Sequence, residues 1–444
     1  MTLKCADNEC SIGGLYPNKL LGLYLICTIC GYSLFYLILG YVGVIEFPSE
    51  DVLVIQCVSL FAFGIFYGIG IKLHHISSLL LLIFIYQFIF SAFLFYSQAF
   101  EYNPDYYSYS AWAWEPIQYH YHNYVEYISR ETRDISDWGY PIFLNMVYNL
   151  AGGKHDGDLL MCICNIFINV FTLIFLWKLA CRMFNAKIAK LTVLLWGLNV
   201  YNIWFNVTGL KEVVFTFFMM GAFYFLYNVS NTNRLKDSCW LFVFVLMTVF
   251  FRYYVTIFFI LIYIASVFFR RLYDNYFTIL ILLAFIFITI GGDLLAYFIP
   301  EVALVYEEQI RVWGSNGVLF SLMNVYSAFI APYPALTSSN QNVNLLTLLF
   351  SILKVSLSFW GIYGIYLLIK NKQTKIYPLI NILLLNIFLT IIAGFSLNYR
   401  YMHITMPLYF IFIIYGFAEN KHKLMVSLLS WGAGGVLTLL YNLK

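Results

Sequence analysis

Residues 101–153 read EYNPDYYSYSAWAWEPIQYHYHNYVEYISRETRDISDWGYPIFLNMVYNLAGG. Carboxylates and aromatic rings are dense in this stretch, whereas the chain on either side of it is mostly hydrophobic. This contrast indicates a polar loop between membrane-embedded helices. We expect the chemistry of the protein to be concentrated in this loop.

The composition predicts the fold class. Hydrophobic residues make up 62% of the 444 residues and charged residues only 11%, whereas soluble domains are roughly half apolar and a quarter charged. A bilayer has no water to satisfy backbone polar groups, so a spanning chain of this kind forms helices. The sequence therefore predicts an all-α integral membrane protein.

Apolar runs long enough to cross roughly 30 Å of hydrocarbon set the expected topology. About thirteen such runs are found, at residues 20–45, 52–71, 76–97, 159–180, 191–207, 213–229, 239–251, 255–269, 276–299, 351–369, 376–397, 404–418 and 424–440. No small-residue cleavage site follows the first run, which reads as a signal anchor. We expect one polytopic domain over residues 1–444, with two large outer loops at 98–158 and 300–342.

The distribution of charge orients these spans. With the N-terminus in the cytoplasm, cytoplasmic segments hold sixteen of the 25 basic residues and five of the 22 acidic residues, as the positive-inside rule requires. The two long outer loops contain none of the nine cysteines, so they need no oxidative folding. We expect a multi-pass protein of the bacterial inner membrane with a cytoplasmic N-terminus.

Both outer loops are expected to contain helices. In the first loop, apolar side chains recur at spacings of three and four, the pattern of an interfacial helix with its rings at headgroup level. They are Trp114, Ile117, Tyr121, Tyr124 or Val125, and Ile128. Pro116 stands where a helix can begin.

Three cations fall at the outer ends of spans, namely Lys211, Arg252 and Arg400. A charge at the edge of the apolar layer is costly unless it is paired or functional. If the three converge, they form a site for a lipid-borne phosphate, with arginine as a bidentate fork. The alternative is that they snorkel, pairing with lipid headgroups or with Glu212.

Arg311 in the second loop is a further candidate for substrate binding. Glu307 precedes it by four residues, so the two could simply form a helical ion pair.

A metal site is not strongly indicated. His120 and His122 are separated by one residue and so point to different faces of a helix, which argues against joint ligation. A divalent metal could be held by the acids of the loop alone. We expect no particular cofactor.

The order of several features resembles a known family. Asp105-Tyr-Tyr-Ser-Tyr is followed by DWGYPIFL at 137–144, KLACRMFN at 178–185, AKLT at 189–192 and LKE at 210–212. Over residues 100–260 this is similar to the N-terminal half of a GT-C superfamily membrane glycosyltransferase. The resemblance implies a sugar donor on a polyprenyl phosphate or pyrophosphate, reaction at the outer face, and a catalytic acid at Asp105.

If the chain is such a glycosyltransferase, the acids of the first loop are the candidates for its catalytic base. An acceptor hydroxyl needs a base within hydrogen-bond reach, and Asp105 is the first candidate, with Asp137 and Glu115 behind it. Each also has a structural alternative: Asp105 as a turn residue after Pro104, and Asp137 and Glu115 as helix caps.

Two alternative functions remain open. The segment NYRYMH at 398–403 and the two large outer loops also resemble Wzy-type polymerases of O-antigen or capsule repeat units. A flippase or other transporter would fit the hydropathy, although such proteins usually carry ionisable groups near mid-span. The expected partners are a lipid-linked saccharide donor, a saccharide acceptor and membrane lipids, and no nucleic acid.

Overall fold

The computed structural model describes residues 65, 74–97, 104–121, 123–132, 134–232, 234–270, 273, 276, 283, 329, 345–392, 399–420 and 423–442. These residues form helices and turns and contain no strand, so the all-α prediction is confirmed for them. The chain divides into two compact units, residues 1–217 and 218–444. The predicted spans at 20–45, 52–71 and 276–299 lie almost entirely outside the described residues, as does the second loop with Arg311.

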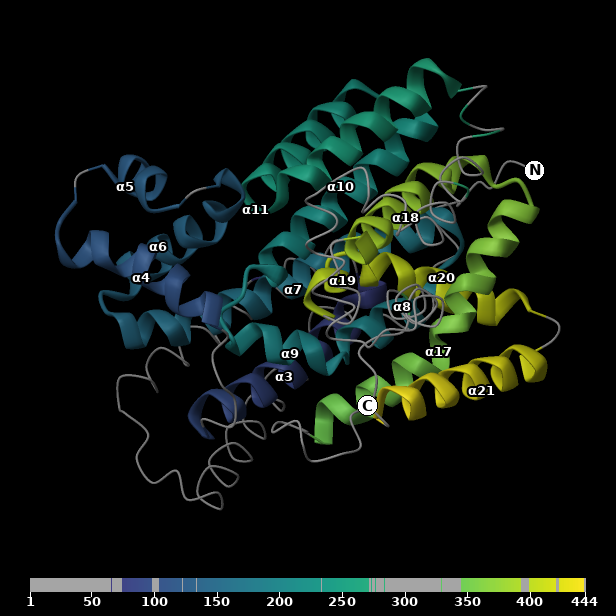
Figure 1. Ribbon diagram of the computed structural model, residues 1–444, viewed down its shortest axis with the longest axis horizontal. Helices are drawn as coiled ribbons and strands as arrows, with labels where there is room; N and C mark the ends of the chain where they lie inside the picture. The colour runs from purple at the N-terminus through teal and green to yellow at the C-terminus, as the bar shows by residue number, and fades with distance from the viewer. Residues whose placement is uncertain are drawn as a thin grey trace, which may run out of the picture. The chain divides into compact units, whose positions relative to one another are not determined.

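The helices of the first unit are shown in Figure 1. They are α3 (His74–Ser97), α4 (Pro104–Gln118), α5 (Tyr124–Glu131), the 3-10 helix η1 (Ile135–Asp137), α6 (Gly139–Ala151), α7 (Lys154–Met183), α8 (Ala186–Gly197), α9 (Val200–Val207) and the start of α10 (Glu212–Thr232). Within this unit α7 packs against α3, α6, α8 and α9, and α4 packs on α6.

The second unit contains the remainder of α10 and the helices that follow it. They are α11 (Leu235–Phe268), α17 (Leu345–Lys370), the 3-10 helix η3 (Thr374–Ile376), α18 (Tyr377–Ile392), α19 (Tyr399–His403), α20 (Met406–Glu419) and α21 (Lys423–Asn442). Within it α17 packs along α20 and α21, and α11 packs against α18.

Six of the described helices are long and apolar enough to cross a membrane: α3, α7, α10, α11, α17 and α18. The pair α8 and α9 also passes when taken together but is bent by 47°. The span predicted at 191–207 corresponds to this bent pair. Asn199 accepts a hydrogen bond from the Tyr201 N–H at 2.9 Å, which caps a new helix and breaks the span.

Helix α11 is a hairpin rather than a straight rod. Arg252 has extended backbone angles (φ −160°, ψ 96°), and the hydroxyls of Thr248 and Thr256 lie 2.7 Å apart. Residues eight apart in a straight helix would be separated by about 12 Å along the axis. The chain therefore reverses at Arg252, and the two arms run side by side (Figure 1). The prediction of separate apolar segments at 239–251 and 255–269 agrees with this reversal.

The predicted interfacial helix of the first loop is broken in two. Helix α4 begins at Pro104 and passes through Pro116, so the expectation that a helix begins at Pro116 is wrong. The chain then turns at His120, whose φ is +54°, and α5 begins after Asn123, which accepts a hydrogen bond from the Glu126 N–H. The apolar spacing that suggested one helix is thus shared between two.

Buried amides join α3, α7 and α9. Asn169 donates to the side-chain oxygen of Asn206 at 2.7 Å, and Asn165 donates to the backbone carbonyl of Asn206 at 3.2 Å. The Asn206 amide in turn donates to the Ser91 hydroxyl at 3.3 Å. All four residues are at most 1% exposed. Hydrogen bonds of this kind hold helices together where apolar contacts alone are not selective.

Candidate functional site

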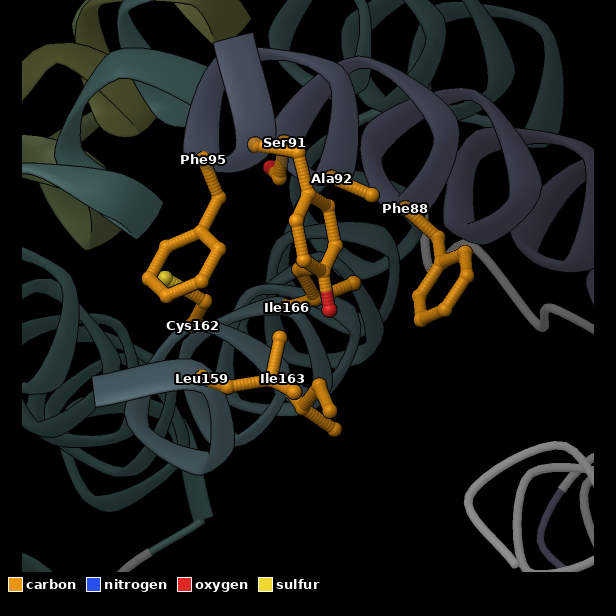
Figure 2. Close-up of a pocket in the computed structure, with 9 residues that line it drawn as sticks. Phe88, Ser91, Ala92, Phe95, Leu159, Cys162, Ile163 and Ile166 are labelled. Atoms are coloured by element: carbon orange, nitrogen blue, oxygen red, sulfur yellow. The ribbon is translucent and has the colours of Figure 1, made fainter. Parts of the chain in front are cut away.

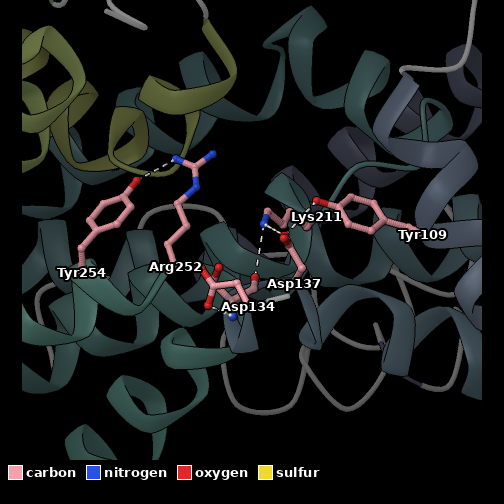
Figure 3. Close-up of polar contacts among 7 residues, drawn as sticks. Tyr109, Asp134, Asp137, Lys211, Arg252 and Tyr254 are labelled. Carbon is pink, nitrogen blue, oxygen red and sulfur yellow. Dashed lines mark hydrogen bonds and ion pairs between the residues drawn. The ribbon is translucent and has the colours of Figure 1, made fainter. Parts of the chain in front are cut away.

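An ion pair anchors the predicted first loop to the turn before α10. The ammonium of Lys211 lies 2.7 Å from Oδ1 of Asp137 and also donates to the carbonyl of Ser136 at 3.3 Å. The Tyr109 hydroxyl donates to the same carboxylate oxygen at 3.3 Å, and the Tyr109 ring lies 5.8 Å from the ammonium. Figure 3 shows these contacts. Lys211 is only 7% exposed, so its charge is neutralised locally by Asp137.

Local backbone geometry positions both partners of this pair. Gly209 has a φ of +64°, which favours glycine, and a Cβ there would meet the Tyr106 ring at 2.1 Å. The turn at Gly209 therefore lets α4 lie against the segment that carries Lys211. On the other side, Asp134 accepts a hydrogen bond from the Ser136 N–H at 3.0 Å and fixes the short helix that carries Asp137.

The three acids predicted as base candidates occupy different surroundings. Asp105 is in the first turn of α4 and is exposed. Glu115 is on the same helix, ten residues later and thus about 15 Å away along the axis, and accepts a hydrogen bond from the Tyr127 hydroxyl at 2.7 Å. The structure does not bring Asp105 and Glu115 together.

The structural alternatives for these acids also need correction. Asp137 does not cap α6, because the N-cap position is Trp138 and no side chain bonds there. Glu115 lies inside α4 rather than before a helix start. Asp105 belongs to a helical turn rather than to an isolated turn after Pro104. Burial and the bond to Glu115 raise the pKa of the Tyr127 phenol, so Tyr127 remains a donor to that carboxylate.

A tyrosine cluster around Asp158 was not predicted from the sequence. The hydroxyls of Tyr106 and Tyr148 both donate to Oδ1 of Asp158, the second at 2.8 Å. Ser110 lies 3.1 Å from the Tyr148 hydroxyl. Burial raises the pKa of Tyr148, and the charge of Asp158 raises it further, so the phenol stays protonated. The spacing of Tyr106 and Ser110, one helical turn apart on α4, was the available signal.

In the second unit, Arg252 stands at the apex of the α11 hairpin. It is 5% exposed, and its guanidinium carbon lies 4.4 Å from the centroid of the Tyr401 ring, within the range of a cation–π interaction. Its Nη1 also donates to the Tyr254 hydroxyl at 3.4 Å (Figure 3). Two aromatic residues therefore orient this guanidinium.

The helix that carries Tyr401 adds further nitrogen groups. Arg400 is its sequence neighbour on α19, and His403 closes the helix. His403 is fully buried, which lowers its pKa, and the charge of nearby Lys354 on α17 lowers that pKa further. Lys354 itself is 1% exposed. We group Arg252, Arg400, His403 and Lys354 as the basic cluster, because Arg252 contacts α19, which carries Arg400 and His403, and His403 interacts with Lys354.

The sequence pointed to half of the basic cluster. Arg252 and Arg400 were predicted from their positions at the ends of spans, and the structure places Arg252 against the neighbour of Arg400. His403 was missed as a site residue, although it lies in the same short motif as Arg400. Lys354 was not predicted as a site residue. The third predicted cation, Lys211, is in the first unit and is held by Asp137.

A pocket between α3 and α7 is too small to hold a sugar. Its volume is about 10 Å³, enough for one water-sized group. Figure 2 shows that its walls are mostly apolar, with Phe88 and Phe95 on one side and Leu159 and Ile163 on the other. Ser91 contributes a hydroxyl. The pocket is therefore a packing defect in the first unit.

Among the residues that the structure describes, no three histidine, cysteine or acidic side chains lie together as a metal site would require. Comparison with protein-family models, with curated proteins and with solved structures found no match to this chain.

Proposed function

We propose that the protein is a membrane glycosyltransferase of the bacterial inner membrane. It takes a saccharide from a polyprenyl phosphate or pyrophosphate donor at the periplasmic face and transfers it to a saccharide acceptor during cell-surface polysaccharide assembly. The observation that carries this proposal is the basic cluster. A buried arginine that contacts the ring of Tyr401, the sequence neighbour of a second arginine, suits the charge and geometry of a phosphate.

The chemistry assigns the cluster to the leaving group. Transfer forms a bond between the acceptor oxygen and the anomeric carbon while the bond from that carbon to the phosphate oxygen breaks. The departing phosphate gains negative charge, and preorganised donors that face this charge lower the barrier. Arg252 and Arg400 take this role, since each can offer two parallel hydrogen bonds.

The acceptor's proton goes to a carboxylate, and Asp105 remains the first candidate. It is exposed at the start of α4. Asp137 is bonded to Lys211 and Tyr109 and Glu115 to Tyr127; both stay behind Asp105, because the resemblance to GT-C glycosyltransferases places the catalytic acid at Asp105. Lys211 accordingly acts through Asp137 and not on the donor.

The α11 hairpin supports the proposed topology of about thirteen spans with a cytoplasmic N-terminus. Both of its open ends carry cations, Arg234 and Lys236 at one and Arg270 at the other, as expected on the cytoplasmic side. Its apex at Arg252 is then periplasmic. Each arm is about 25 Å long, close to the thickness of the hydrocarbon core.

A Wzy-type repeat-unit polymerase is the second candidate, and one observation favours it. The segment that resembles those enzymes contains α19, which provides Arg400 and His403 to the basic cluster and carries Tyr401, the ring that contacts Arg252. Deletion of the gene followed by gel analysis of surface polysaccharide separates the candidates. Loss of the ladder with a single-repeat band retained indicates a polymerase, whereas a full ladder of altered mobility indicates a side-branch transferase.

Transfer from a radiolabelled lipid-linked saccharide by the purified protein in detergent tests the proposal against a flippase. A transferase forms a new glycosidic bond and releases the polyprenyl carrier in equal amount. A flippase moves the intact donor across vesicles and forms no product.

A further inference from the structure

A small polar hollow lies in the second unit, where the ends of α10 and α11 meet η3 and the start of α18. Arg270 and Lys375 line it, together with the hydroxyl-bearing residues Ser230, Ser266 and Thr374. Tyr273 forms part of its wall and is 2% exposed. Its hydroxyl oxygen is fixed by a hydrogen bond from Asn381 at 2.6 Å.

The chemistry of the lining selects an anion with several oxygens. Two cations flank the hollow, and both side chains are exposed, so they can adjust to a ligand. The Ser230 hydroxyl is buried and has no hydrogen-bond partner among the described residues. A buried hydroxyl without a partner costs roughly 1–3 kcal/mol, which an oxygen atom of a ligand would recover.

The size of the hollow narrows the class of ligand. Its volume is about 10 Å³, room for a single oxygen atom. A sugar ring is excluded, but one oxygen of a phosphate can enter toward Ser230 while the others stay at the mouth between Arg270 and Lys375. All three residues line the same hollow, so each offers a donor to a tetrahedral group held there.

The position of the hollow favours a phosphate carried by a lipid. It lies at the ends of two helices long and apolar enough to span a membrane, α10 and α11, and beside the start of a third, α18. Such ends lie at headgroup depth, and basic pockets between spanning helices on the cytoplasmic side bind anionic headgroups.

We propose that this hollow binds a phosphate group, supplied by the headgroup of an anionic membrane lipid. The site is separate from the basic cluster and does not depend on the proposed glycosyltransferase activity. Free inorganic phosphate offers the same chemistry, and the experiment below separates the two sources.

The test measures thermal stability of the purified, delipidated protein in a neutral detergent. Phosphatidylglycerol, phosphatidylcholine and inorganic phosphate are added in separate titrations. We expect phosphatidylglycerol to raise the melting temperature and phosphatidylcholine to leave it unchanged. Inorganic phosphate should act only at far higher concentration. If it acts as strongly as the lipid, the site belongs to free phosphate and the lipid source is wrong.

The double variant Arg270→Gln/Lys375→Gln should weaken the effect of phosphatidylglycerol about thirtyfold, since each cation near the surface contributes about 1 kcal/mol. Arg234→Gln/Lys236→Gln is the matched control, because it removes two exposed cations of the same unit that do not line the hollow. Ser230→Ala should weaken binding while keeping every charge. Equal loss in both double variants, or no stabilisation by either phosphate, would overturn the proposal.

Discussion

The guanidinium carbon of Arg252 lies 4.4 Å from the centroid of the Tyr401 ring. This contact joins the apex of the α11 hairpin to α19, two elements that are far apart in the sequence. A cation–π contact of this kind contributes about 0.5–2 kcal/mol. It also fixes the plane of the guanidinium, which a bidentate phosphate contact requires.

The hairpin leads to a topological prediction. Reporter fusions after Lys187, Lys236 and Lys372 should score as cytoplasmic, and fusions after Ser129 and Asn340 as periplasmic. An insertion at the Arg252 apex should also score as periplasmic, because the chain reverses there. A periplasmic signal after Lys236 would contradict the assignment of the two arms.

Asp137 and Lys211 should behave as a structural pair. Asp137→Asn leaves the buried ammonium without its counter-charge and should cost about 3 kcal/mol, the lower end for a broken buried pair, because the Asp137 side chain is 37% exposed. Denaturation in detergent measures this. The double variant Asp137→Asn/Lys211→Met should be more stable than Asp137→Asn alone. If the losses of stability in Asp137→Asn and in Lys211→Met, each measured alone, add up to the loss in the double variant, the pair is not coupled.

Close packing of α17 on α20 predicts a strong effect at Gly364. A Cβ at this position would lie 2.2 Å from the carbonyl oxygen of Phe412, so Gly364→Ala should destabilise by about 1–3 kcal/mol. Gly432→Ala on α21 is the control, since nothing lies within 4 Å of a Cβ there, and alanine is the better helix former. Equal melting temperatures for the two variants would show that the helices are not in close contact.

The spans were predictable because burial in lipid requires long apolar runs, and α3 matches its predicted run closely. The break between α8 and α9 was not predictable, because the apolar pattern continues through it and only Asn199 indicates a new helix cap. The prediction of one interfacial helix was wrong for a similar reason, since apolar spacing alone does not reveal the turn at His120.

Side-chain partners were harder to predict than helices. Asp137 and Lys211 are 74 residues apart, and nothing local in the sequence pairs them, so Glu212 was the natural alternative for Lys211. The cations at the ends of spans were identifiable because a charge at the edge of the apolar layer is costly unless it is paired or functional. The place of His403 in the basic cluster and the contacts of Tyr106 with Asp158 depend on tertiary packing, which hydropathy does not encode.

Asp105→Asn tests the proposed base. The amide keeps the shape of the side chain but cannot take the acceptor's proton, so turnover should fall by about 10² to 10⁴ while donor binding and the amount of protein in the membrane stay at wild-type level. Glu131→Gln, an exposed acid of α5, is the control. Activity within about threefold of wild type would remove Asp105 from the mechanism and leave Asp137 and Glu115 as candidates.

The basic cluster is tested most directly by saccharide transfer from a polyprenyl pyrophosphate donor with purified Arg252→Lys and Arg400→Lys proteins. Lysine keeps the charge but loses the fork, so each variant should lose about a hundredfold in turnover, while Arg234→Lys, exposed at the start of α11, should match wild type. Wild-type protein should form one glycosidic bond for each carrier released. No product from the wild type, or near-normal transfer by both arginine variants, would contradict the account.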